Sequence, residues 1–155
     1  MQKLLITYGT RPLAQRLSKI LLPEFEVFLA TSEEIPSFLS SNFPKIPTGA
    51  NPTFAHEMLK LSLDKQIDFL LPLGLPEIQS LANSKILFEE YGIEVLSPNT
   101  EVLETLFVLE NPASSVPMSL LWNGKSLNGT ANYSDSLSGL YAISDEGDEV
   151  ALCTV

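Results

Sequence analysis

The sequence predicts an α/β fold: a three-layer, Rossmann-like parallel sheet with a small C-terminal β-hairpin extension. The first sign is a continuous apolar run at residues 4–8 and a second apolar stretch within residues 68–72, which are typical of strands buried on both faces. The second is that each run passes into a turn with glycine and proline, where a helix can begin. Because strands alternate with helices as far as residue 107, we expect parallel pairing through right-handed crossovers.

The first strand and helix show this pattern most clearly. Gly9 allows a tight turn after the strand at 4–8, and Thr10 is the predicted cap of the following helix. Pro12 lies in the first turn of the helix, where its missing N–H costs nothing. The buried face of the helix carries apolar residues at helical spacing, namely Leu13, Leu17, Ile20 and Leu21. Pro23 ends the helix.

The remaining elements of the sheet follow in the same alternating order. Further strands are predicted at 26–30, 68–72 and 94–96, with a brief edge strand around 45–46, where prolines interrupt the chain. Further helices are predicted from Pro52 to about residue 63, from Gly74 to Tyr91, and from Ser97 to residue 107. With the strands counted along the chain, we expect the order 3-2-1-4-5.

A sheet of this order has a preferred place for a ligand. The carboxyl ends of the first and fourth strands meet where the strand order reverses, and ligands of open α/β sheets bind there. The loops after these two strands would face each other across one crevice, supplying an arginine, a hydroxyl group, a carboxylate and two helix N-termini. The candidate ligand-binding residues are Gly9, Thr10, Arg11, Gly74, Pro76 and Glu77.

The glycine turn after the first strand is not a complete nucleotide motif. Gly9 stands alone, so the G-x-G-x-x-G fingerprint is incomplete, and no glycine-lysine-serine or glycine-lysine-threonine triplet opens the helix. Two interpretations stay open: a turn glycine beside a surface arginine, or a loop that contacts a ligand. Glu33 lies where dinucleotide-binding folds carry a ribose-binding acid, but without the other glycines we interpret it as a solvated turn residue.

Residues 108–155 differ in composition from residues 1–107 and form the second predicted part of the chain. A strand is expected at 118–122, and two β-rich runs at 140–143 and 150–152 flank an acidic turn, which we interpret as solvated. This extension is too short to build its own core. We therefore expect it to pack on the α/β domain or on a partner subunit, as in a homodimer.

The overall charge limits the classes of partner. With 9 basic and 19 acidic residues, the chain has a formal net charge of −10, which disfavours nucleic acid and anionic membrane surfaces. No apolar run reaches the roughly 20 residues of a membrane span. One cysteine, Cys153, and one histidine, His56, provide neither a disulfide framework nor the cysteine or histidine pairs of a zinc site. We expect a cytoplasmic protein with no metal and no cofactor.

Four phrases of the sequence, with the spacing of the elements, carry a family resemblance. They are KLLIT at 3–7, DFLLP at 68–72, EEYGI at 89–93 and VLSPN at 95–99. They resemble the N-terminal pre-ATP-grasp domain of the ATP-grasp carboxylate-amine ligase superfamily. The resemblance covers roughly residues 1–107 and implies a domain that packs against an ATP-grasp domain and helps to wall its substrate site. The nucleotide-binding and magnesium-binding residues of the family belong to that following domain, so the resemblance implies no ligase activity for this chain alone.

The expected function is that of a stand-alone, non-catalytic module. It would bind a small anionic metabolite or a nucleotide at the crevice, with Arg11 meeting the anion, or serve as a subunit of a separate ATP-grasp protein. One alternative is a small enzyme in which Glu77 is the acid or base while Arg11 and Thr10 hold the substrate. Another is a purely structural homodimerisation module. No nucleophile-base pair or metal set stands out, so no catalytic residue is assigned.

Overall fold

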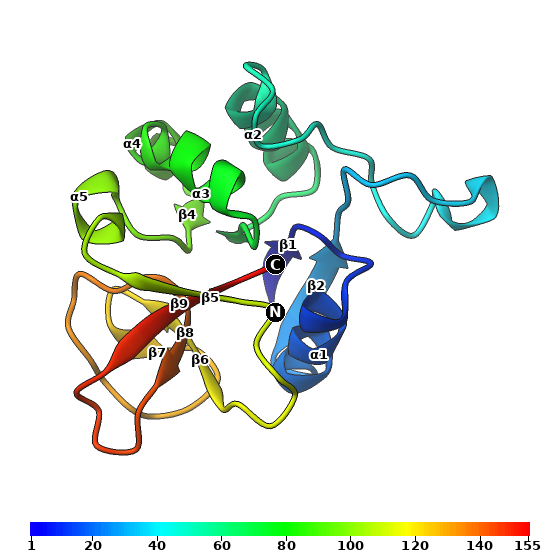
Figure 1. Ribbon diagram of the computed structural model, residues 1–155. Helices are drawn as coiled ribbons and strands as arrows, with labels where there is room; N and C mark the ends of the chain where they lie inside the picture. Colours follow the sequence, from blue (N-terminus) through cyan, green and yellow to red (C-terminus); the bar gives the residue numbers. More distant parts are fainter.

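The computed structural model describes all 155 residues and shows an α/β fold with two sheets (Figure 1). The first, called here the parallel sheet, has the order β2-β1-β3-β4 and consists of β1 (Gln2–Ile6), β2 (Phe25–Leu29), β3 (Phe69–Leu71) and β4 (Glu94–Val95). The second, called the C-terminal sheet, has the order β5-β9-β8-β6-β7 and consists of β5 (Phe107–Glu110), β6 (Met118–Trp122), β7 (Lys125–Ser126), β8 (Gly139–Ile143) and β9 (Val150–Thr154). In it, β5 runs parallel to β9 and the other pairs are antiparallel.

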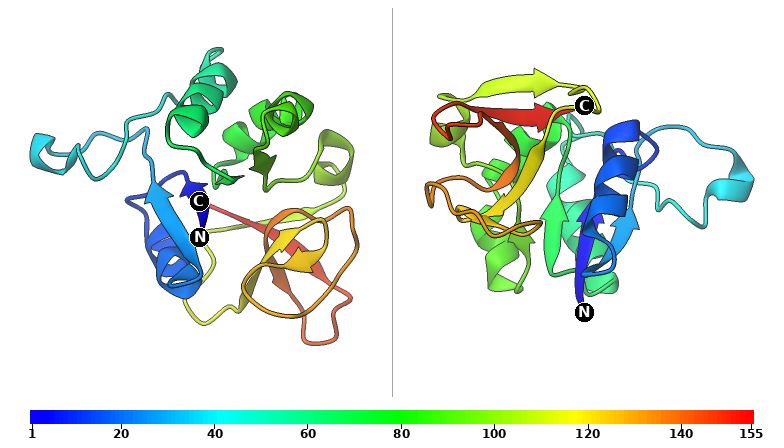
Figure 2. Two further views of the ribbon diagram at one scale, coloured as in Figure 1. Left: turned by 180° about the vertical axis from the view of Figure 1, so that it is seen from behind. Right: turned by 90° about the horizontal axis from the view of Figure 1, so that it is seen from below.

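The parallel sheet is covered on both faces by different kinds of structure. The helices are α1 (Pro12–Leu21), α2 (Phe54–Asp64), α3 (Leu75–Ala82), α4 (Lys85–Glu90) and α5 (Thr100–Leu103), with a 3-10 turn η1 (Ser37–Leu39). α2, α3 and α4 lie on one side of the sheet, and α1 lies on the other side together with the C-terminal sheet (Figures 1 and 2). None of these helices has the length and apolar character that crossing a membrane requires.

The side chains of β1 show why a continuous apolar run predicts a strand in this position. Leu5 packs into the cluster formed with α2, α3 and α4, whereas Leu4 and Ile6 pack into the cluster formed with α1 and the C-terminal sheet. All three side chains are fully buried. Since successive side chains of a strand point to opposite faces, burial on both sides keeps these three positions apolar.

The C-terminal sheet shares its core with the α/β part of the chain. Leu120, Leu140 and Cys153 belong to the same apolar cluster as residues of β1, β3 and α1. The ring of Trp122 meets that of Phe69 edge to face, with centroids 5.3 Å apart. At the end of the chain, Val155 N donates a hydrogen bond of 2.9 Å to Leu73 O. Residues of the C-terminal sheet thus pack against β1, β3 and α1 of the same chain.

The five-stranded order 3-2-1-4-5 is not established, because only four strands form. The segment around Lys45, expected as an edge strand, makes an isolated parallel bridge to Thr31 beyond the end of β2. Thr31 N donates to Pro44 O and Ile46 N donates to Thr31 O, and the pairing stops there. Pro44 and Pro47 lack the N–H groups that a longer ladder needs.

Two predicted helices differ from the observed ones. The helix expected from Gly74 to Tyr91 is interrupted after Ala82, so α3 and α4 are separate. The helix expected to reach residue 107 ends at Leu103, and Phe107 begins β5, where it pairs with Ala151. The apolar residues expected on one face of this single helix are thus divided between a short helix and a strand. Pairing with β9 overrides the weak local preference of the segment for a helix. The strand at 118–122 and the β8–β9 hairpin are confirmed.

The shared core predicts that both parts of the chain unfold together. Leu140→Ala should lower the free energy of unfolding by about 2–5 kcal/mol, because it leaves a cavity between the two sheets. Ile86→Ala, at a side chain that is 74% exposed, is the matched control and should have little effect. Fluorescence of Trp122 and far-UV circular dichroism should report one coincident transition in urea. Separate transitions for the two signals would show that the core is not shared.

Candidate functional site at the carboxyl edge of the parallel sheet

The loops after β1 and β3 lie next to each other, but the expected crevice between them is filled by Tyr8. A methyl group placed on Gly74 would lie 2.5 Å from Cε2 of Tyr8, so the ring packs directly on the glycine. Tyr8 adopts φ = 51°, a left-handed conformation that is uncommon for a bulky residue. Gly74 is therefore required for the close approach of the Tyr8 ring, which brings the two loops together.

Glu77 is buried beneath the loop that precedes α3. Its side chain is 1% exposed, and its Oε1 accepts hydrogen bonds from Thr7 Oγ1 at 2.5 Å and from Gly74 N at 3.2 Å. Thr7 Oγ1 in turn accepts from Leu73 N at 2.8 Å. Burial raises the pKa of Glu77 to about 7, although these hydrogen bonds work in the opposite direction. The carboxyl group thus fastens β1 to the start of α3.

The position of Glu77 differs from the role expected for it. The sequence suggested a carboxylate that faces a ligand, together with Arg11, across the crevice. The structure instead turns the carboxyl group inward to Thr7, while Pro76 lies on the surface in the first turn of α3. The assignment of Glu77 as an accessible acid or base is not supported by this geometry.

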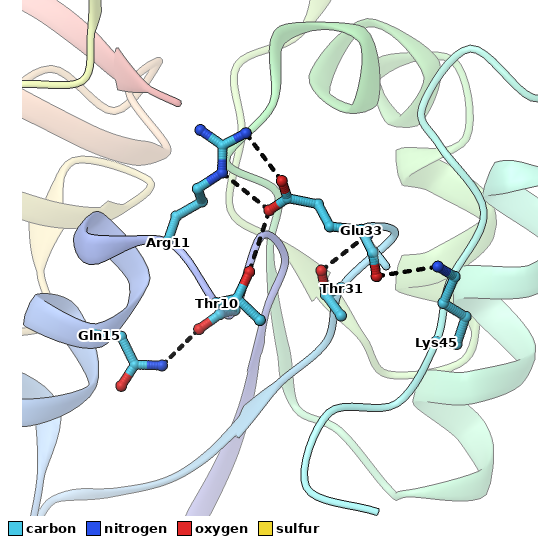
Figure 3. A network of polar contacts seen from close by, with 7 residues as sticks. Thr10, Arg11, Gln15, Thr31, Glu33 and Lys45 are labelled. Carbon is cyan, nitrogen blue, oxygen red and sulfur yellow. Dashed lines mark hydrogen bonds and ion pairs between the residues drawn. The ribbon is translucent and has the colours of Figure 1, made fainter. Parts of the chain in front are cut away.

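A second set of polar side chains lies on the open side of the same edge, between β1 and β2. The guanidinium of Arg11 donates from Nε to Glu33 Oε1 at 2.9 Å and from Nη2 to Glu33 Oε2 at 3.0 Å, which makes a bidentate pair (Figure 3). Thr10 Oγ1 donates to Glu33 Oε1 at 3.2 Å. We call these three residues the carboxyl-edge cluster. It joins the turn before α1 to the loop after β2.

Backbone contacts hold both sides of the carboxyl-edge cluster in place. On the β1 side, Gln15 Nε2 donates to Gly9 O at 2.7 Å, and a methyl group on Gly9 would lie 2.6 Å from Cβ of Leu29. On the β2 side, Glu33 N donates to the hydroxyl of the buried Thr31 at 3.0 Å. Lys45 Nζ donates to Glu33 O at 3.0 Å, so the bridge near the edge of the sheet also fixes the position of Glu33 (Figure 3).

The electrostatics of the cluster favour both charged forms. The hydrogen bonds from Arg11 lower the pKa of Glu33, and the same pair raises the pKa of Arg11. The side chains are 43% and 32% exposed, respectively, so water screens the pair and its contribution to stability is small. Nη1 of Arg11 makes no hydrogen bond within the chain. The guanidinium carbon lies 5.8 Å from the ring centre of Tyr8.

The predicted site residues are thus divided into two groups. Thr10 and Arg11 belong to the carboxyl-edge cluster, with the buried Gly9 beneath them, whereas Gly74, Pro76 and Glu77 lie at the start of α3, where Gly74 and Glu77 are buried and Pro76 is exposed. Thr10 makes no capping hydrogen bond to α1 and instead contacts Glu33.

Sequence reasoning missed two contributors to the site. It treated Glu33 as solvated and did not consider Tyr8 as a site residue. The position of Glu33 directly after the second strand could have indicated its part in the site. No local pattern in the sequence indicated where the Tyr8 ring lies.

The C-terminal sheet explains why only one side of the edge is open. Val155 is bonded to Leu73, and Gly139 lies close to the end of β4, because a methyl group there would be 3.2 Å from Leu96 O. The carboxyl ends of β3 and β4 therefore have the C-terminal sheet beside them. The carboxyl ends of β1 and β2 carry the exposed polar groups of the carboxyl-edge cluster.

Two further observations concern the identity of the site. No group of three or more His, Cys, Asp or Glu side chains is arranged to hold a metal ion. Comparison of the sequence with models of protein families and with curated proteins finds no match.

Burial of Glu77 predicts a specific dependence of stability on pH. The pKa in the native state lies above the ordinary value of 4.5, so the native state binds the proton more tightly than the unfolded chain. The stability that this group contributes is present below about pH 4.5 and is lost as pH rises to about 7. The total loss in free energy of unfolding is about 3 kcal/mol at most.

The substitution Glu77→Gln isolates this effect, because glutamine keeps an oxygen for Thr7 and Gly74 but carries no charge. In urea denaturation the variant should be more stable than the wild type at pH 8, and the difference should shrink towards pH 4.5. A variant that is less stable at pH 8 would mean that the carboxylate is favourable where it lies.

Proposed function

We propose that this protein is a non-catalytic binding module that takes a small anionic ligand at the carboxyl-edge cluster. The supporting observation is the bidentate Arg11–Glu33 pair, held at the open carboxyl ends of β1 and β2 with Thr10 beside it. Glu33 fixes the plane of the guanidinium, so the cost of ordering a long side chain is already met when a ligand arrives. Nη1 of Arg11 is the donor that meets the anion.

A nucleotide matches the cluster better than a simple anion does. Glu33 offers carboxylate oxygens next to the arginine, and carboxylates at the end of a second strand accept hydroxyl groups of ribose in dinucleotide-binding folds. Tyr8 adds an aromatic ring within reach of Arg11. A ligand with an anionic group, hydroxyl groups and a planar ring therefore uses all four side chains.

The pre-ATP-grasp class is part of this proposal. A parallel sheet with α1 on one face and α2, α3 and α4 on the other, and with glycine turns at the ends of β1 and β3, agrees with the resemblance over residues 1–107. The expected fifth strand is proposed to correspond to the bridge at Lys45, and the five-stranded order 3-2-1-4-5 to describe the family from which this sheet derives. In this proposal a role as a subunit of an ATP-grasp protein is compatible with ligand binding.

The catalytic alternative receives less support than binding. It needs Glu77 to reach a substrate held by Arg11, but Glu77 is bonded to Thr7 and Gly74 in the interior. The exposed carboxylate near Arg11 is Glu33, whose lowered pKa makes it a poor proton donor or acceptor at neutral pH.

Thermal-shift measurements with inorganic phosphate, nucleoside monophosphates and small carboxylates test the proposal. A ligand present at a hundred times its dissociation constant adds about 2.7 kcal/mol of stability. Arg11→Ala should abolish the shift. Lys19→Ala, which removes another exposed cation from α1, is the matched control and should leave the shift unchanged.

The variant Glu33→Gln separates the two parts of the site. Loss of the carboxylate removes repulsion of an anion, so the shift with inorganic phosphate should increase. The same change leaves one neutral acceptor oxygen in place of two charged ones and so weakens the hydrogen bonds from ribose hydroxyls, and the shift with a nucleoside monophosphate should fall relative to that with phosphate. Absence of any shift across the panel with the wild-type protein, or equal shifts in wild type and Arg11→Ala, would contradict the proposed function.

A further inference from the structure

The C-terminal sheet has an edge that the chain leaves open. β5 pairs with β9 and with no other strand. Asn111 N donates to Thr154 O at 2.7 Å, and alternate residues of a parallel edge strand face its neighbour. The N–H and C=O groups of Val108 and Glu110 therefore point away from β9. They are available to another strand.

The other edge of the C-terminal sheet is short and covered. β7 has two residues, and its loop folds back on it, because Ser126 N donates to Ala131 O and Lys125 bridges to Asn132. In the parallel sheet, β4 also has two residues, whereas the edge strand β2 has five and meets the segment around Lys45 only beyond its carboxyl end, at Thr31. Short strands and covering loops are the usual protection of sheet edges. β5, with four residues and neither proline nor lysine, lacks this protection.

Apolar side chains are exposed along β5. Phe107 is 82% exposed and Val108 is 43% exposed, on opposite faces of the strand. On the face of Phe107 the surface forms a groove of about 800 Å³. Its apolar lining includes Leu106, Phe107, Val116, Pro117, Ile143 and Val150.

The groove is acidic at one end. Asp148 and Glu149 line it, and no lysine or arginine does. These two residues continue the hairpin turn that also contains Asp145 and Glu146. Arg16 donates hydrogen bonds to the carbonyl groups of Ala113 and Val116, and none of the four carboxylates of the turn forms an ion pair within the chain.

We propose that β5 and this groove bind an extended, basic segment of a partner protein, which adds to the C-terminal sheet as a sixth strand. The main chain of the segment pairs with Val108 and Glu110, an apolar side chain covers Phe107, and lysine or arginine side chains meet Asp148 and Glu149. A second copy of this chain fits the surface less well, because two molecules that each carry a net charge of −10 repel one another.

Fluorescence anisotropy with a labelled peptide tests this proposal directly. The probe is a peptide of about ten residues that carries valine and, towards one end, lysine at alternate positions so that both lie on one face, with threonine between them, and its matched control carries glutamate in place of lysine. The lysine peptide should bind with a dissociation constant below about 1 mM, and its affinity should fall as salt is added. The glutamate peptide should not bind. Equal binding of both peptides, or no binding of the lysine peptide, would overturn the proposal.

Variants locate the peptide on the protein. Phe107→Ser should weaken binding about tenfold or more, because an exposed aromatic side chain is the expected anchor. Phe38→Ser, at a side chain 79% exposed in η1, is the matched control and should bind as the wild type does. The double substitution Asp148→Asn with Glu149→Gln should weaken binding and reduce its salt dependence.

The main-chain part of the interaction needs its own variant. Val108→Pro removes an N–H that points away from β9. It should therefore weaken binding of the peptide, while the urea unfolding midpoint stays close to that of the wild type. Unchanged binding in both Phe107→Ser and Val108→Pro would place the peptide elsewhere and overturn the proposal. Sedimentation equilibrium that shows a dimer abolished by Phe107→Ser would also overturn it, in favour of a second copy as the occupant.

Discussion

Burial of the C-terminal sheet against the parallel sheet is the interaction on which the rest of the structure depends. α1 covers only part of its face, and Leu120, Leu140, Trp122 and Cys153 fill the remainder. Neither side has a complete core without the other, since a segment of this size cannot bury enough apolar surface alone. The outcome is a conventional helix layer on one face and a mixed layer, helix plus sheet, on the other.

This packing also decides which part of the carboxyl edge is open. The last residue of the chain is bonded to Leu73, and the Tyr8 ring lies on Gly74, so the half of the edge near β3 is filled. Thr10, Arg11 and Glu33 remain on the other half. The buried carboxyl group of Glu77 stabilises this division by joining the ends of β1 and β3 from below. Position in the layered fold, more than any motif, makes the carboxyl-edge cluster the candidate site.

Much of the architecture follows from patterns that are local in the sequence. Apolar runs such as Leu4–Ile6 and proline-opened helices such as α1 depend on neighbouring residues, and these elements were predicted to within a few positions. The strand at 107–110 was not, because Phe107 acquires its strand conformation from β9, more than forty residues away. The pairing of Arg11 with Glu33 and the inward turn of Glu77 likewise depend on how loops meet in space. Neither spacing nor composition specifies those contacts.

The claim that the carboxyl-edge cluster is the binding site is tested most directly by amide chemical shifts of the isotope-labelled protein during titration with adenosine monophosphate. Binding at the carboxyl-edge cluster predicts concentration-dependent shifts concentrated at residues 8–14 and 31–34, with little change in the C-terminal sheet. Shifts that instead cluster along β5 and the β8–β9 turn, or an unperturbed spectrum at millimolar nucleotide, would contradict it.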